Sequence, residues 1–287
     1  MIFHKYLPKI QIHPILLIFI LIAFITGTFM ELSIIIAIVF IHELGHYTMA
    51  RIFKWRIQRI ILWVFGGVMK TEEHGNRPLF EEALVIISGP FQHLNIYLIV
   101  QLLHMGNFLP YTVIELILYY NTIIFIFNLL PIWPLDGGKL LFILLSYFFP
   151  FKKSYHSTLI FSMIVSIVLI IGHFWFLNFT LSFFLIFVFL LMENRNDWKQ
   201  RYYIFIRFLL NRYEGNMPIK GIQPIIISSQ SKLMDIFSRF RRERKHSIYI
   251  TYPNQQRISV DESECLRYYF HDKNYQQTIG DLLNGTT

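Results

Sequence analysis

His42, Glu43 and His46 form an HExxH motif, the arrangement in this sequence with the clearest chemical meaning. On a helix, residues four positions apart lie on one face, so both imidazoles can bind the same zinc ion. The glutamate beside them can act as a general base toward a water molecule that the metal activates. The alternative is a pair of structural histidines that hydrogen-bond to neighbouring helices.

The motif lies inside an apolar stretch, because the residues from Leu32 to Ile41 are apolar except for Ser33. An acidic side chain in the middle of a membrane span costs about 2.5–3.5 kcal/mol on insertion scales, so such residues mark functional sites. A soluble metalloprotease would carry the motif on an amphipathic helix. The sequence therefore predicts an intramembrane metalloprotease.

A catalytic zinc site needs a third protein ligand, and Asp136 is the strongest candidate. Pro131 and Pro134 prevent a regular helix before it, and the glycine pair after it lets the chain pass close to a metal. The alternative is an N-cap aspartate that opens a helix over 139–149. The two roles are compatible within one turn.

Asn128 is an intramembrane amide that can hydrogen-bond the substrate backbone or stabilise an oxyanion, and we expect it and Pro131 to contact substrate. The alternative role for Asn128 is a hydrogen bond between helices. Two further histidines, His74 and His93, are weaker ligand candidates. His13 and His104 lie near predicted membrane interfaces. Four acidic residues lack calcium-loop spacing and are interpreted as loop residues in water: Glu72, Glu73, Glu81 and Glu82.

The composition predicts a protein of the lipid bilayer. Hydrophobic residues make up 54% of the 287 residues and charged residues 15%, against about 25% charged residues in a soluble domain. The net charge of +8 does not indicate a nucleic-acid partner, because the basic residues flank apolar segments instead of forming one surface. The single cysteine, Cys265, excludes an internal disulfide.

Apolar segments of membrane-spanning length predict an α-helical polytopic membrane protein with about six transmembrane helices. The segments are approximately 14–30, 32–50, 83–103, 113–131 continuing into 137–149, 157–173 and 175–192. Lysine and arginine occur before the first span and after the second, fourth and sixth, but not in the other loops. Positive residues stay inside, so both termini are predicted to be cytosolic.

Residues 56–71 are rich in β-branched and aromatic residues and contain a Gly66-Gly67 turn signal, which favours a β-hairpin over a helix. Its apolar core predicts that the hairpin enters the membrane region beside the catalytic helix, where non-helical backbone is tolerated only against protein or water. An extended substrate segment can pair with its edge. The alternative is a short amphipathic surface helix.

The last part of the chain is polar, and we divide the sequence into a protease domain (1–198), a linker (199–218) and a small α/β domain (219–287). The strands are predicted at 224–228, 246–252 and 257–260, and the helices at 232–244 and 262–270. A domain of about seventy residues buries little apolar surface, so a partner surface is expected to stabilise it.

The HExxH motif in one span and Leu135-Asp136-Gly137 in a later one resemble the site-2 protease family of intramembrane zinc metalloproteases, in particular its sporulation members. The segments 72–79 and 128–140 carry the closest resemblance, which extends over essentially the full chain. It implies that His42, His46 and Asp136 bind zinc and that Glu43 is the catalytic base. It also implies a membrane hairpin near the site and a C-terminal CBS-like cytosolic domain of the kind that often senses adenine nucleotides such as ATP.

The resemblance further implies a membrane-tethered sigma-factor precursor as substrate, cleaved near the cytosolic face, and membrane proteins that inhibit or regulate the protease. A single CBS-like module would pair with another, so we expect a homo-oligomer. Two rival interpretations remain: a membrane zinc transporter and a nucleotide-sensing membrane scaffold. A transporter would show paired polar spans and inverted repeats, whereas this sequence has one HExxH and no second matching half.

Overall fold

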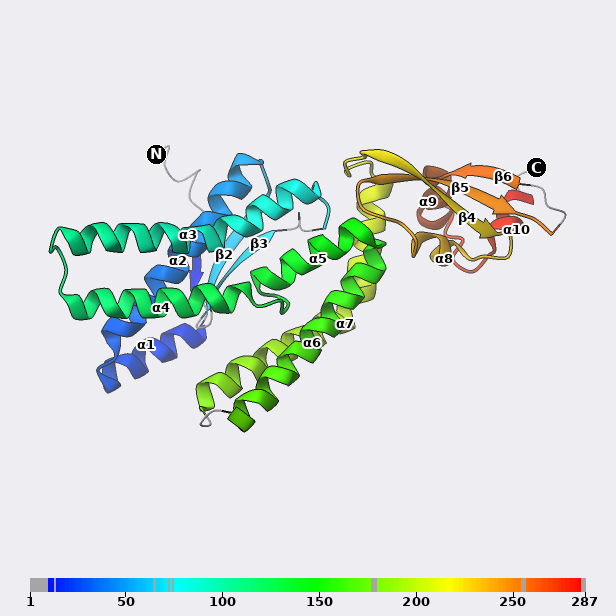
Figure 1. Ribbon diagram of the computed structural model, residues 1–287. Helices are drawn as coiled ribbons and strands as arrows, with labels where there is room; N and C mark the ends of the chain where they lie inside the picture. Colours follow the sequence, from blue (N-terminus) through cyan, green and yellow to red (C-terminus); the bar gives the residue numbers. More distant parts are fainter. Residues whose placement is uncertain are drawn as a thin grey trace. The chain divides into compact units, whose positions relative to one another are not determined.

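The structure, a computed structural model, describes residues 10–12, 14–63, 66–71, 73, 75–176, 180–253 and 257–284 (Figure 1). His13, Glu72 and His74 lie outside these residues, so the expectations for them have no structural counterpart. Contacts within the chain define two compact units. The first comprises residues 1–74, 80–140 and 180–186, and the second comprises residues 75–79, 141–179 and 187–287.

The first unit is built from apolar helices and a small sheet. Its helices are α1 (Pro14–Thr26), α2 (Phe29–Ile52), α3 (Leu79–Met105), α4 (Tyr111–Leu129) and the beginnings of α5 (Asp136–Phe148) and α7 (Leu181–Tyr213). Gly27 has a φ of +75° and ends α1, which allows the tight turn into α2. Ile38 of α2, Ile96 of α3 and Ile114 of α4 share one buried cluster, which holds the three helices together.

Four helices among the described residues are long and apolar enough to span a membrane: α2, α3, α4 and α6 (Phe151–Phe176). Their outer faces carry exposed apolar side chains, such as Leu98 and Leu102, which are 61% and 60% exposed. Such faces are typical of contact with lipid. The protein is therefore a membrane protein. The expected six spans stay a prediction, because α1 has only 13 residues. The cytosolic location of both termini also stays a prediction.

The predicted hairpin is present. Strand β2 (Ile57–Trp63) pairs antiparallel with β3 (Gly66–Thr71), and the surface-helix alternative is wrong. A third strand that the sequence did not reveal, β1 (Ile10–Ile12), pairs parallel with β2. The order β1-β2-β3 leaves β2 central and β3 at an edge. Met69 of β3 packs against the cluster around Val39 of α2, which places the sheet beside the HExxH helix.

In the second unit, α7 (Leu181–Tyr213) continues through most of the segment expected as a linker. Residues 199–213 are therefore helical, while the division into protease domain, linker and C-terminal domain stays a prediction. Phe205, Phe208 and Leu209 are buried at helical spacing, and the ring of Phe208 stacks 4.1 Å from that of Phe151, so apolar packing sustains the helix. The chain leaves the helix only near Gly215, which has a φ of +74°.

The C-terminal part has the predicted β-α-β-β-α order with one additional helix. Its elements are β4 (Gly221–Ser228), α8 (Leu233–Phe237), β5 (Arg244–Thr251), β6 (Arg257–Asp261), α9 (Glu262–Phe270) and α10 (Ile279–Asn284). Strands β4 and β5 are parallel, and β5 and β6 are antiparallel. The helix expected over 232–244 ends at Phe237, and the chain then turns into β5 through Glu243, whose φ is 56°. Its CBS-like identity stays a prediction.

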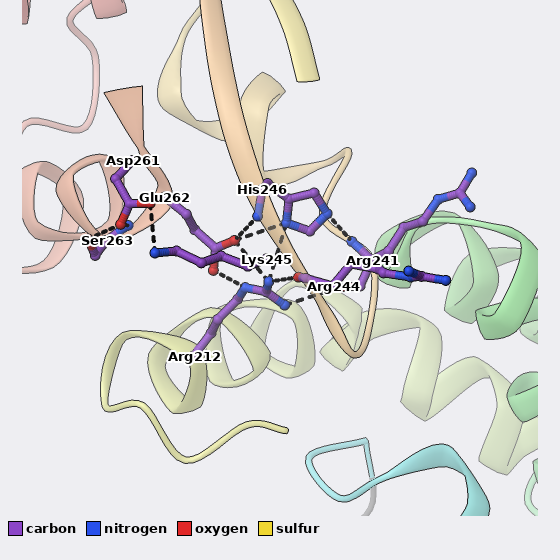
Figure 2. A network of polar contacts seen from close by, with 8 residues as sticks. All are labelled: Arg212, Arg241, Arg244, Lys245, His246, Asp261, Glu262 and Ser263. Carbon is purple, nitrogen blue, oxygen red and sulfur yellow. Dashed lines mark hydrogen bonds and ion pairs between the residues drawn. The ribbon is translucent and has the colours of Figure 1, made fainter. Parts of the chain in front are cut away.

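A buried ion-pair network joins the end of α7 to this C-terminal part (Figure 2). The guanidinium of Arg212 pairs with the carboxylate of Glu262 and donates to the carbonyl oxygens of Arg241 and Arg244. The backbone N–H of His246 donates to Glu262 at 2.8 Å, and its Nδ1 lies 2.9 Å from the same carboxylate oxygen. The helix and the small sheet are therefore fastened by buried charges as well as by apolar contacts.

Candidate active site

The three residues of the HExxH motif lie in the second half of α2 and are buried. His42, Glu43 and His46 are 4%, 4% and 5% exposed. The helix continues for six residues beyond His46, so both histidines are held in regular helical backbone. Their Nε2 atoms lie 3.0 Å apart, which confirms the prediction that the two imidazoles face one point.

Asp136 is the first residue of α5, and its side chain reaches the same point. Its Oδ2 atom lies 3.1 Å from Nε2 of His42 and 3.1 Å from Nε2 of His46. The helix break predicted from the prolines is present, because α4 ends at Leu129 and α5 begins at Asp136. The position expected for the third ligand and the start of α5 therefore coincide in Asp136, as the sequence allowed.

The two glycines after Asp136 allow the chain to double back tightly. A Cβ atom on Gly137 would lie 2.2 Å from the carbonyl oxygen of Leu129, and one on Gly138 would lie 2.4 Å from the carbonyl carbon of Ile132. Any larger residue would push the start of α5 away from the end of α4. The glycine pair thus determines where the aspartate is placed.

Two more glycines bring α2 and α3 into close contact at the site. A Cβ atom on Gly45 would lie 2.4 Å from the carbonyl oxygen of Ser88. A Cβ atom on Gly89 would lie 2.3 Å from Nε2 of His46 and 2.9 Å from Cε1 of His42. The backbone of α3 therefore forms a wall against both imidazoles, and only glycine fits there.

A hydrogen bond to a group outside the three donors determines the state of His46. Its Nδ1 lies 2.8 Å from the backbone carbonyl oxygen of Val85. A carbonyl oxygen can only accept, so Nδ1 carries the hydrogen and donates it. In the neutral ring Nε2 then has a free lone pair, directed at Asp136 and His42. This is the tautomer that a metal-binding histidine needs.

The donor set fits a zinc ion. His42, His46 and Asp136 are the only group of three or more possible metal-binding side chains found in the described part of the chain. A tetrahedral zinc with bonds of about 2.0–2.1 Å places its ligand atoms about 3.3 Å apart, close to the 3.0–3.1 Å separations here. Three buried lone-pair donors that face each other repel unless a cation lies between them. Two nitrogens and one oxygen also leave a fourth position for water or substrate.

Lys139 holds the other oxygen of the aspartate. Its Nζ atom lies 3.1 Å from Oδ1 of Asp136, one turn further along α5. Lys139 was not predicted from the sequence, although its position three residues after the aspartate was a usable signal.

Glu82, at the start of α3, is 2% exposed, so its expected place in a loop in water is wrong.

His93 and Asn121 also reach the site, and both are fully buried. Nε2 of His93 lies 3.1 Å from Nδ1 of His42, and Nδ1 of His93 lies 2.7 Å from Oδ1 of Asn121. His93 therefore contacts the ring nitrogen of His42 that faces away from the donor group, and it is not itself part of that group. Asn121 was missed, although a polar residue in the apolar helix α4 is itself a signal of function.

The remaining predicted residues have other surroundings. The side-chain amide of Asn128 donates to the carbonyl oxygen of Ile124 in its own helix at 3.0 Å. Pro131 lies in the connection between α4 and α5. The ring of His104, at the end of α3, lies 6.1 Å from that of Tyr111, so this histidine is remote from the donor group in sequence and contacts.

A helix-borne HExxH pair completed by an aspartate from a later helix defines a metallopeptidase site. The model of peptidase family M50 matches residues 30–111 and 104–172, which include all three donors. The chain belongs to this family, the site-2 proteases, and is a zinc metalloprotease. This membership favours a peptidase over the zinc-transporter and scaffold alternatives.

Individual relatives agree with this assignment. The chain is 40% identical over 276 residues to stage IV sporulation protein FB of Bacillus subtilis (strain 168), covering 96% of each chain. It is 31% identical over 156 residues to a zinc metalloprotease of Methanocaldococcus jannaschii, covering 50% of this chain and 45% of that protein. Its fold is similar to the solved site-2 protease from the same archaeon, with a TM-score of 0.52, 22% identity, and coverage of 65% of this chain and 89% of that one.

Proposed function

We propose that this chain cleaves a membrane-tethered polypeptide near the cytosolic face, with His42, His46 and Asp136 as zinc ligands and Glu43 as the general base. The observation that carries the proposal is the convergence of two imidazole nitrogens and one carboxylate oxygen within 3.0–3.1 Å of each other, inside an apolar helix bundle. The buried glutamate follows directly after one ligand on the same helix.

The residues of this chain divide the work of hydrolysis. Zinc, when bound, supplies Lewis-acid polarisation of the water and of the scissile carbonyl. Glu43 takes a proton from the attacking water as the carbon–oxygen bond forms, and it delivers that proton to the amine as the carbon–nitrogen bond breaks. Lys139 keeps Oδ1 of Asp136 engaged, so Oδ2 remains directed at the imidazoles.

The proposed substrate is a sigma-factor precursor processed during sporulation. The full-length similarity to stage IV sporulation protein FB supports the sporulation context, and the resemblance in the two motif regions supports the substrate class. A helical substrate hides its carbonyl groups in its own hydrogen bonds, so it must unwind locally before cleavage. The edge strand β3 offers an extended partner for the unwound segment.

Regulation is proposed to involve membrane proteins that hold the protease silent and the C-terminal domain (219–287), with both termini in the cytosol. α7 extends to Tyr213, which supports a firm rather than a loose connection to that domain. Binding of ATP and homo-oligomer formation through this domain stay predictions. Equilibrium nucleotide binding and light scattering of the detergent-solubilised chain would test them.

Co-expression with a sigma-factor precursor, followed by the size of the precursor on a gel, tests the function. Wild type is expected to cleave the precursor, whereas Glu43→Gln is expected to bind zinc and leave it intact. The matched control is Glu31→Gln, which replaces the other glutamate of α2, in the first turn of the helix. Cleavage by Glu43→Gln would overturn the assigned base. Zinc movement across vesicles without cleavage would revive the transporter alternative.

A further inference from the structure

We propose that His93 and Asn121 are positioning residues that fix the ring of His42 as a zinc ligand, through hydrogen bonds that run from α4 to α3 to α2. The inference rests on the proposed zinc-binding role of His42 and adds two residues that do not touch the metal. Both are fully buried, and each comes from a different helix of the bundle.

The relay begins at the side-chain amide of Asn121. Its Nδ2 atom donates to the backbone carbonyl oxygen of His93 at 3.1 Å. Because a carbonyl oxygen cannot donate, this bond sets the orientation of the amide and turns Oδ1 toward the imidazole of His93. That oxygen lies 2.7 Å from Nδ1 of His93, so this nitrogen carries the hydrogen and donates it.

The state of His93 then determines the state of His42. A neutral imidazole with its hydrogen on Nδ1 has a lone pair on Nε2. This atom lies 3.1 Å from Nδ1 of His42, so the ring of His42 donates there. The hydrogen of His42 is thereby held on the side away from the donor group. The lone pair of its Nε2 faces Asp136 and His46, as zinc binding requires.

The two histidines of the motif differ in how this state is secured. His46 donates to the backbone carbonyl oxygen of Val85, which no substitution of a side chain removes. The Nδ1 bond of His42 depends on the side chain of His93, which depends in turn on Asn121. Of the two histidines, His42 is therefore the one whose ring orientation depends on other side chains.

A purely structural role in joining α3 to α4 predicts something different, and the structure contains the matching control. The hydroxyl groups of Tyr97 and Thr122 lie 2.6 Å apart, one turn along α3 and one residue along α4 from the relay. This bond joins the same two helices but involves no donor group. Tyr97→Phe removes it with the loss of one oxygen atom.

The test uses the purified full-length chain in detergent and zinc alone as the ligand. Zinc affinity is measured by competition with a chromophoric chelator for wild type, His93→Leu, Asn121→Ala, His93→Gln and Tyr97→Phe. Glutamine can accept from His42 and donate to Asn121 with one side chain, so it preserves both ends of the relay. Leucine at position 93 preserves neither end, whereas Asn121→Ala removes the oxygen that holds the hydrogen on Nδ1 of His93.

We expect His93→Leu and Asn121→Ala to bind zinc about 10–100-fold more weakly than wild type, the usual effect of losing a hydrogen-bond partner of a metal ligand. His93→Gln and Tyr97→Phe are expected to stay close to wild type. Equal zinc affinity in His93→Leu and Tyr97→Phe would overturn the proposal. If His93→Leu does not fold, Asn121→Ala decides, and wild-type affinity in that variant overturns the proposal equally.

The outcome separates this inference from the proposed function. Tight zinc binding by wild type and by both disrupted variants refutes the relay, while cleavage lost in Glu43→Gln still supports the protease mechanism. Failure of wild type to bind zinc at all refutes the zinc ligands, and with them the relay. As a second readout, the visible absorption spectrum of the cobalt-loaded chain should change in Asn121→Ala and be preserved in His93→Gln.

Discussion

Nζ of Lys139 lies 3.1 Å from Oδ1 of Asp136, while Oδ2 of the same carboxylate lies 3.1 Å from both imidazoles. The two oxygens of one side chain therefore have separate partners. This division favours coordination through a single oxygen, because the second is held by a charged hydrogen bond.

Removal of this lysine is expected to weaken the zinc site. Lys139→Met should lower zinc affinity or activity about 10–100-fold, because the aspartate loses the partner that orients it. Lys139→Arg keeps a positive donor and should retain much more of both. Measuring zinc content and precursor cleavage in the same preparations checks this. Wild-type zinc affinity in Lys139→Met would show that the backbone alone orients the carboxylate.

A single methyl group on α3 is expected to inactivate the protein. Gly89→Ala would place a Cβ atom 2.3 Å from the ring of His46, so the ring or the helix must move. A displacement of about 1 Å at a catalytic group costs about 100-fold in rate. Gly172→Ala is the control, because a Cβ atom there meets nothing within 4 Å. Comparable cleavage by the two variants would mean that α3 yields without cost.

Proline substitutions at Val68 and Met69 test whether substrate pairs with the edge strand. Backbone N–H groups of neighbouring residues point to opposite sides of a strand, so one proline removes a donor of the hairpin and the other a donor of the free edge of β3. The variant whose proline removes an N–H group from the free edge of β3 is expected to lose cleavage. It should keep its zinc and its thermal stability. Full activity in both variants would exclude this mode of binding.

Loss of Arg212 is expected to destabilise the C-terminal part strongly. Its side chain and that of Glu262 are 4% and 6% exposed, and removing one partner of a buried ion pair costs about 3–5 kcal/mol. Lys220→Met breaks the pair between this exposed lysine and Glu243 and should cost about 0–1 kcal/mol. The only cysteine, Cys265, is buried there, so its labelling by a thiol reagent in increasing urea reports unfolding of this part of the full-length chain.

The same network predicts that the free energy of unfolding decreases as the pH is lowered. Burial is the largest influence on the pKa of Glu262 and raises it, but hydrogen bonds from His246 and Arg212 together hold the pKa below its ordinary value. Burial lowers the pKa of His246 and outweighs its bond to Glu262. Both groups therefore bind protons more readily in the unfolded chain, so acid favours unfolding. Stability should decline below about pH 6.5 through the histidine and further below about pH 4.3 through the glutamate.

Labelling of Cys265 with a reagent that reacts in acid measures this pH dependence. Glu262→Gln is expected to lose the lower of the two declines, whereas Glu264→Gln in the same helix should keep both. A pH profile unchanged by Glu262→Gln would place the acid sensitivity elsewhere.

Local sequence patterns predicted much of the architecture. The HExxH spacing brought His42 and His46 to one point because a helix fixes the relation of residues four apart. The hairpin at 56–71 followed from its composition and its glycine turn. Pro131 and Pro134 predicted the helix break before Asp136 for the same local reason.

The errors and omissions depend on contacts between distant segments. Strand β1 pairs with residues about fifty positions away in the sequence. The strand has only three residues, and so short a segment carries no pattern that indicates its partner. The segment 199–213 is polar enough to resemble a linker, yet packing of Phe205 and Phe208 against Phe151 keeps it helical. Asn121 meets His93 only through the packing of α4 on α3, so its place near the site required the structure.

The depth of the site has a kinetic consequence. His42, His46 and Asp136 are only 3–5% exposed, so metal, water and peptide have little access to their donor atoms from solvent while the helices stay together. Exchange is then expected to depend on a transient opening of the bundle. Under this gating, the rate at which a chelator strips the site becomes independent of chelator concentration, and the frequency of opening sets the upper limit on turnover.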